Sequence, residues 1–250
     1  MTHYRLAPFF IGCLAVLFLM ASALPAAAAV LKTSTGYFID VNHRTTAYFK
    51  AGTEATFRPD GSVSAGTLLS SGGYYIDEDQ RFTAYFAGGT AITFRDNGSV
   101  SAGTLLHHSG YFIDENQSLT AFFTGGTPVS FRDNGSVSSG QIFSNSTFFV
   151  DEKHRYAAEF QGRTVLQFRA DGSVANGQIA AKSTFYIDEK HRYTTQFAGG
   201  SVLQFRPDGS VASGTIHSDS TFFTDEKHTV TASFRAGTTL TFRPDGSVQP

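Results

Sequence analysis

The sequence has no tryptophan and only one cysteine, Cys13, in a chain of 250 residues. A single cysteine cannot form an intramolecular disulfide, so the fold must draw its stability from apolar packing and backbone pairing. Cys13 also lies in the middle of an apolar run rather than after it, which argues against lipid attachment. A small scaffold held together by disulfides is therefore excluded.

Charged residues are scarce as well, at 16% of the chain, and the formal net charge is −2. Proteins that bind nucleic acid or anionic lipid carry a clear excess of Lys and Arg on one face or segment. The composition gives no such excess, so we expect a partner other than nucleic acid.

The first 29 residues differ in kind from the rest of the chain. Arg5 is their only charged residue, residues 6–20 are apolar, and residues 21–29 are mostly alanine. This is the pattern of a signal peptide with a small-residue cleavage site. A membrane anchor is the alternative, but the apolar run is too short to span comfortably. We predict a signal peptide over residues 1–29, cleaved near Ala29, and a secreted or periplasmic protein with no membrane span after cleavage.

Phenylalanine and glycine are abundant, with 25 of each, and they mark an internal repeat. The phrase Phe57-Arg58-Pro59-Asp60-Gly61-Ser62-Val63 returns every 37 residues, with its Phe at positions 94, 131, 168, 205 and 242. A fixed period of this length is the signature of a repeat architecture. The repeat domain, residues 30–250, divides into units 30–66, 67–103, 104–140, 141–177, 178–214 and 215–250.

Each unit is predicted to hold four short strands. In the second unit, residues 73–76, 82–86, 90–95 and 100–106 are β-rich runs separated by polar or glycine turns. Asp-Gly and Asn-Gly turns accept positive φ and favour hairpins. We expect an all-β protein of about 24 strands connected as an antiparallel meander, with no helical periodicity after residue 29.

Columns of apolar residues indicate which face of each strand is buried. Phe49 recurs at the same place in every unit, and the residue two positions earlier is alanine in all units but one. Residues two apart share one face of a strand. The first strand, with Tyr37, Phe38 and Ile39, is apolar on both faces, so we expect it to be covered on both sides. One unit cannot bury these faces alone, but stacked units can.

The stretch at residues 57–66, Phe-Arg-Pro-Asp-Gly-Ser-Val-x-x-Gly, resembles the hairpins of MORN-type and related bacterial β-repeats. The resemblance covers about ten residues of each unit. It implies an elongated, curved antiparallel sheet that serves as a scaffold or binding surface, and it implies no catalytic residue.

A six-bladed β-propeller is the alternative architecture. The end units carry no obvious polar cap, and Val30-Leu31 could complete the last unit's shortened fourth strand, with Leu31 in the column of Leu68. Propeller blades pack on both faces, however, whereas most strands here are apolar on one face only. We therefore expect a curved or rolled array of six repeats.

Two columns of charged residues could carry chemistry. An aspartate ends the first strand of every unit, and three residues later four of the units have a histidine. Asp-x-x-His could hold a metal or another ligand. Two units lack the histidine, however, and no third ligand accompanies it, so we expect the aspartate to accept hydrogen bonds from its own turn. The candidate ligand-binding residues are Asp151, His154, Asp188, His191, Asp225 and His228.

The second column is arginine, at positions 58, 95, 132, 169, 206 and 243. Its regularity suggests a ladder of ion pairs with the aspartates, with a row of sugar- or carboxylate-binding groups as the alternative. No Gly-x-Ser-x-Gly signature occurs, and Asp96-Asn97-Gly98 lacks the spaced ligands of a calcium loop. The sequence therefore names no catalytic residue, no metal ligand set and no cofactor.

These observations favour an exported, non-catalytic repeat protein that acts as a binding or scaffold module at the cell surface or in the periplasm. A lectin-like, multivalent ligand-binding protein is the alternative. Either reading leaves the partner, a protein or a glycan, unidentified.

Overall fold

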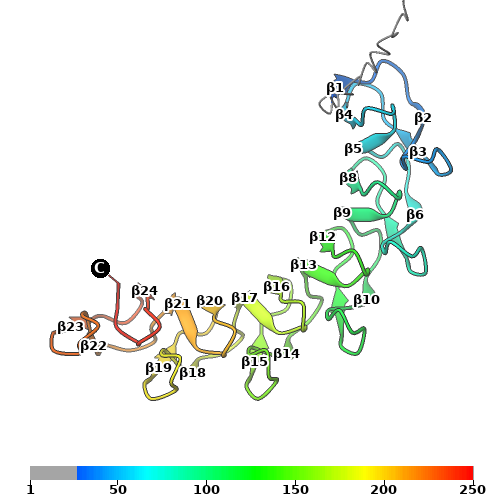
Figure 1. The fold of residues 1–250 in the computed structure, drawn as a ribbon. Coiled ribbons are helices and arrows are strands. Elements are labelled where there is room, and N and C mark those ends of the chain that lie inside the picture. The colour runs from blue at the N-terminus through cyan, green and yellow to red at the C-terminus, as the bar shows by residue number, and fades with distance from the viewer. Residues whose placement is uncertain (1–26, 250) are drawn as a thin grey trace, which may run out of the picture.

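The computed structural model describes residues 27–249, and all regular elements in that range are β-strands. These residues include no helix long and apolar enough to cross a membrane. The 24 strands form an open arc of two layers (Figure 1). The prediction of an all-β, curved array of six repeats is confirmed, with four strands in each of the first five units and three in the sixth within the described residues.

The inner layer is one antiparallel sheet of 12 strands that lines the concave side of the arc (Figure 1). Its strands, in spatial order, are β1 (Ala27–Val30), β4 (Glu54–Phe57), β5 (Val63–Thr67), β8 (Ala91–Phe94), β9 (Val100–Thr104), β12 (Pro128–Phe131), β13 (Val137–Gln141), β16 (Val165–Phe168), β17 (Val174–Gln178), β20 (Val202–Phe205), β21 (Val211–Thr215) and β24 (Thr239–Thr241).

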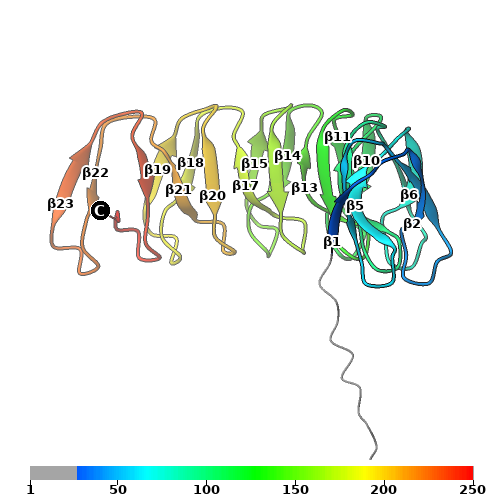
Figure 2. The same ribbon diagram turned by 90° about the horizontal axis from the view of Figure 1, so that it is seen from above.

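The outer layer consists of six separate two-stranded hairpins on the convex side, which stand side by side along the arc (Figure 2). They are β2 (Thr35–Phe38) with β3 (Thr46–Phe49), β6 (Gly72–Tyr75) with β7 (Thr83–Phe86), β10 (Ser109–Phe112) with β11 (Thr120–Phe123), β14 (Ser146–Phe149) with β15 (Ala157–Phe160), β18 (Ser183–Tyr186) with β19 (Thr194–Phe197), and β22 (Ser220–Phe223) with β23 (Thr231–Phe234).

Within a unit, the four strands do not pair as one continuous meander but as two separate pairs in different layers. The first two strands of a unit pair in the outer layer, and the last two pair in the inner sheet. The fourth strand also pairs with the third strand of the next unit, as β5 does with β8, so the inner sheet runs unbroken through the array. Each layer has one apolar face, and folding the unit into two layers lets these faces bury each other.

The core lies between the layers. Phe86 of an outer strand is fully buried, and its ring meets the ring of Phe131 from the next unit edge-on, with centroids 6.3 Å apart. The fourth strand carries a glycine opposite each such ring, and a Cβ on Gly103 would lie 2.7 Å from Cδ1 of Phe86. Glycine is needed here because the ring occupies the space of a side chain. The same packing links the units into one continuous core.

The first strand of a unit is not covered on both sides, contrary to expectation. Ile39 is fully buried, whereas Phe38 and Tyr75 face outward and are about two-fifths exposed. The reason is the architecture, because residues 27–249 form two layers and place no third layer over the outer hairpins.

The alternative architecture, a six-bladed β-propeller, is wrong, because the array is open. β1 and β24 are the two edges of the inner sheet and lie at opposite ends of the molecule (Figure 1). Leu31 does occupy the column of Leu68, since each accepts a 2.8 Å hydrogen bond from the equivalent glycine, Gly52 or Gly89. It completes the first unit rather than the last. The predicted signal peptide overlaps β1 at residues 27–29, and the rest of that prediction lies outside the described residues.

Candidate functional site

The aspartate column forms buried turns. Both oxygens of Asp188 are used: Oδ1 accepts hydrogen bonds from the amides of Arg192 and Tyr193 at 2.8 Å, and Oδ2 accepts one from Arg192 Nε at 3.1 Å. Asp151 makes the equivalent bonds within its own turn. The φ of 55° at His191 turns the chain back, so these later amides reach the carboxylate. The predicted turn role is confirmed, and the donors are the amides four and five residues after the aspartate.

The same hydrogen bonds set the protonation of these carboxylates. Burial by itself would raise the pKa of Asp188, but the hydrogen bonds from Tyr193 and Arg192 outweigh it. The pKa of Asp188 therefore lies below its ordinary value, and so does the pKa of Asp151 for the same reason. Both groups are held as carboxylates.

The next unit covers each of these turns. Gly209 lies against Asp151, where a Cβ would come within 3.0 Å of the aspartate Cβ, and the amide of Glu152 donates to Pro207 O at 2.9 Å. Asp225, in the sixth unit, has no such cover within residues 27–249 and is half-buried. The carboxylates of Asp151 and Asp188 are thus enclosed at unit junctions, which favours a structural role over a ligand-binding role for both.

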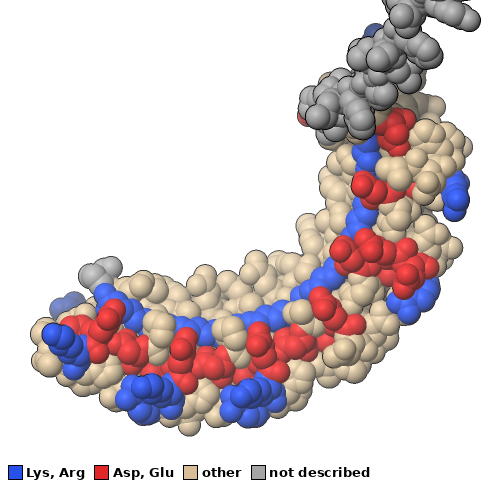
Figure 3. Space-filling model, in the orientation of Figure 1, with Lys and Arg blue, Asp and Glu red and all other residues tan. Residues whose placement is uncertain are grey.

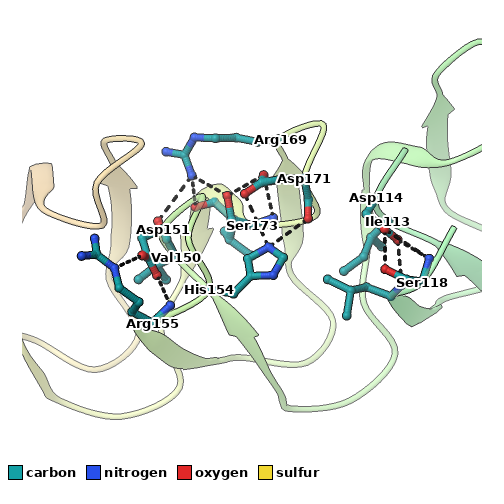
Figure 4. Close-up of polar contacts among 12 residues, drawn as sticks. Ile113, Asp114, Ser118, Val150, Asp151, His154, Arg155, Arg169, Asp171 and Ser173 are labelled. Atoms are coloured by element: carbon teal, nitrogen blue, oxygen red, sulfur yellow. Dashed lines mark hydrogen bonds and ion pairs between the residues drawn. The ribbon is translucent and has the colours of Figure 1, made fainter. Parts of the chain in front are cut away.

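The histidines point to a different aspartate from the one in their own motif. Asp151 faces Arg155, whereas His154 faces Asp171, with Nε2 3.5 Å from Oδ2 (Figure 4). The equivalent distance is 3.3 Å from His191 to Asp208 and 3.4 Å from His228 to Asp245. Asp-x-x-His therefore does not act as one pair of ligands. Within residues 27–249, no group of three His, Cys, Asp or Glu side chains could hold a metal ion.

The sequence contains a signal for this pairing that its interpretation missed. Units with histidine have aspartate in the hairpin turn 17 residues later, and the two units with glutamine have asparagine there. In the third unit, Gln117 Nε2 donates instead to the backbone carbonyl of Asn134, and Asn134 Nδ2 donates to the backbone carbonyl of Glu115, both at 2.9 Å. Histidine and aspartate thus occur together in the units where their side chains face each other.

Around His191 an aromatic cage closes the junction between units. The imidazole stacks on Tyr186, with centroids 4.6 Å apart, and Nδ1 lies 3.2 Å from the hydroxyl of Tyr156 in the preceding unit. His228 is held in the same way by Phe223 and Tyr193. These histidines fill the space between successive outer hairpins.

The arginine column joins units through backbone carbonyls. Arg206 Nη1 donates to Val211 O at 3.0 Å within its own unit, and Nη2 donates to Phe242 O in the next. The arginines form a continuous stripe along one edge of the arc, beside a row of acidic residues (Figure 3). The predicted ion-pair ladder with the aspartate column is wrong, since Arg58 and Arg95 pair instead with Asp96 and Asp133 of the following turns, at 2.8 and 2.7 Å.

The sequence interpretation also missed a row of exposed aromatic rings on the convex face. Tyr48, Tyr85 and Phe122 are 60%, 59% and 57% exposed. Each stands opposite a glycine on the neighbouring strand of its hairpin. The equivalent pairs in the last three units are Thr147 with Glu159, Thr184 with Gln196, and Thr221 with Ser233.

A surface hollow of about 390 Å³ lies between the second and third outer hairpins. Phe82 and Phe112 form its apolar walls, with ring centroids 5.8 Å apart, and Thr83, Thr120 and Arg81 add polar groups. In the corresponding place between the fourth and fifth hairpins, His191 packs against both Tyr156 and Tyr186. Here the third unit has Gln117 instead of histidine, and its Nε2 donates to Asn134 O.

These features define an open, two-layer array of β-hairpin repeats in which the repeated charged columns hold the units together. No protein-family model matches the chain, and no curated protein matches its sequence. The resemblance to MORN-type hairpins therefore stays a prediction.

Proposed function

We propose that the chain is an exported, non-catalytic repeat protein that acts as a binding or scaffold module at the cell surface or in the periplasm. The observation that supports the proposal is that the repeated charged residues hold the units together, whereas the exposed aromatic rings face outward. Asp188, Arg206 and His191 are engaged in contacts within and between units, whereas the outward hairpin face carries exposed aromatic rings. An extended outer face suits contact with a large partner better than it suits turnover of a small substrate.

Export is tested by the intact mass of the protein recovered from the secreted or periplasmic fraction. Removal of an N-terminal segment ending near Ala29 supports the proposal, and a mass that still includes residues 1–29 contradicts it. The mass also reports how much of β1 stays, because its residues Ala27–Ala29 pair with β4 and a cleavage before them would keep that strand.

The module role is tested by sedimentation of the purified mature protein with cell-envelope fractions. Saturable co-sedimentation that survives 0.5 M NaCl (about a 4–5 Å Debye length) supports a specific, non-electrostatic contact. Co-sedimentation that salt abolishes would contradict the proposed role for the apolar outer face.

A further inference from the structure

The six units have nearly the same core but not the same outer face. In the first three units an aromatic residue faces glycine across the hairpin, and in the last three a polar residue faces threonine. Both arrangements occur in hairpins with the same four-residue strands and the same register. Folding therefore does not require the aromatic version, and its restriction to adjacent units indicates a separate role.

The rings of the first three units are preorganised. A Cβ on Gly73 would lie 3.1 Å from Cε1 of Tyr85, and one on Gly110 would lie 3.3 Å from Cδ2 of Phe122, so each ring rests over a glycine. More than half of each ring residue stays exposed to solvent. Because its neighbours already limit its movement, such a ring loses little entropy when a ligand packs on it.

The hollow between the second and third hairpins adds polar groups beside these rings. Gly110, which lies under Phe122, also lines the hollow, so the ring and the hollow adjoin. Arg81 is fixed there, because its guanidinium lies 5.2 Å from the centroid of Phe82 and Nε lies 3.4 Å from Asp77 Oδ2. The hydroxyls of Thr83 and Thr120 complete a site that combines apolar ring faces with hydrogen-bonding groups.

The lack of charge at the outward strand positions of the first three units indicates that the ligand is neutral. The outward strand positions of the first three hairpins are all uncharged: Gly36, Phe38, Thr46, Tyr48, Gly73, Tyr75, Thr83, Tyr85, Gly110, Phe112, Thr120 and Phe122. The guanidinium of Arg81, at the edge, is already paired with Asp77 and Asp79. A neutral ligand with apolar C–H faces and many hydroxyls matches this surface, and a saccharide has that chemistry.

The spacing of the rings indicates a polymer. Each unit adds two strands to the inner sheet, which corresponds to about 9–10 Å along the concave side and more along the convex side. One ring recurs per unit in three successive units, so a chain of repeating sugars can engage several rings at once. Weak contacts of this kind become strong together because the later ones are intramolecular.

We propose that the convex face of the first three units, defined by Tyr48, Tyr85, Phe122 and the hollow beside Phe112, binds an extended neutral polysaccharide. The proposal names the ligand class of the binding module proposed above and rests on that function.

The test compares the wild-type chain with a variant in which two units receive the outer pair of the fifth unit. The substitutions Gly73→Thr, Tyr85→Gln, Gly110→Thr and Phe122→Gln reproduce the pair Thr184 and Gln196, which this fold already accommodates. The matched control changes the polar half instead, with Glu159→Ala and Gln196→Ala.

Each protein is sedimented with insoluble cellulose, chitin, xylan and mannan, and with cross-linked pectate as an acidic comparator. We expect the wild-type chain and the control to bind at least one neutral polysaccharide. The four-substitution variant should bind it at least tenfold more weakly, with an unchanged melting temperature.

Three binding results would overturn the proposal: no binding to any neutral polysaccharide, equal binding by wild type and variant, or a preference for pectate. Analytical ultracentrifugation tests the alternative that the aromatic face binds a second copy of the chain. If the wild-type chain dimerises and the variant does not, the aromatic face binds a second copy and the saccharide proposal is wrong. If the protein is exported but binds none of these probes, the saccharide proposal is wrong while the scaffold function still stands. The experiment therefore distinguishes failure of one proposal from failure of the other.

Discussion

At the residue scale, the repeated charged residues are explained by the junctions they occupy. Asp188 is buried, yet its carboxylate accepts two amide hydrogen bonds and faces one guanidinium. A buried carboxylate is tolerated when such partners replace the lost water. In the first five units this turn lies beneath a glycine of the next unit, which explains why the aspartate recurs there.

We expect Asp188→Ala to lower the free energy of unfolding by about 2–3 kcal/mol, because it leaves the amides of Arg192 and Tyr193 unpaired. Urea denaturation measures this loss. Asp225→Ala, at the uncovered turn of the sixth unit, is the matched control and should cost less. Equal losses at the two positions would contradict the role assigned to the covering unit.

The lowered pKa of Asp188 makes the stability of the wild-type protein depend on pH. The unfolded carboxyl titrates near 3.9, so the stabilisation from Asp188 is complete above that pH and disappears as the pH falls through the lower folded-state pKa. The wild type should therefore lose part of its stability in acid, and the difference between wild type and Asp188→Ala should shrink below about pH 4. Urea melts of both proteins at several pH values measure this convergence.

At the element scale, the glycines of the fourth strands are set by the rings that pack on them. A Cβ on Gly140 would lie 2.8 Å from Cδ1 of Phe123, which is fully buried and cannot move away freely. The alternation of β13, which places Gly140 inward, also keeps its neighbour Ser139 partly exposed. Strand and ring are therefore matched in shape as well as in polarity.

We expect Gly140→Ala to destabilise the protein by about 1–3 kcal/mol, since the added methyl group overpacks the core. Ser139→Ala, one position away on the same strand, should change the stability by less than about 0.5 kcal/mol. Thermal or urea unfolding of both variants is the measurement. A neutral or stabilising Gly140→Ala would show that the layers are packed more loosely than the structure indicates.

At the scale of the whole molecule, the stability of the open arc depends on contacts between adjacent units. Inner strands link each unit only to the units before and after it. For such arrays, stability is roughly a sum over units and their interfaces. A closed ring would behave differently, because losing one unit would break closure.

Deletion of residues 178–214, one complete 37-residue unit, should therefore leave a folded five-unit array with a lower melting temperature. Circular dichroism should keep its β signature, and X-ray scattering should report a shorter arc. The control deletes 36 residues, 178–213, which puts the following strands out of phase and should prevent cooperative folding. Complete unfolding of the in-phase deletion would contradict the open array.

Much of this fold could be predicted because periodicity and turn chemistry are local properties. The 37-residue phase, the strands, the hairpin turns and the buried Phe49 column can all be read from residues close together in the chain. The aspartate turn was also predictable, since its partners lie four and five residues away. The split of each unit into two layers was not, because it depends on pairing between units.

The candidate site likewise has features that local sequence predicts and features that only the tertiary structure shows. The sequence alone determined an all-β repeat domain and a turn role for its aspartates. Only the tertiary structure decided that Arg206 reaches the carbonyl of Phe242, that His191 faces Asp208, and that the Tyr85 ring lies exposed over Gly73. The physical reason is that these contacts join segments 12–36 residues apart, whose relative placement follows from how the strands pair and the layers stack.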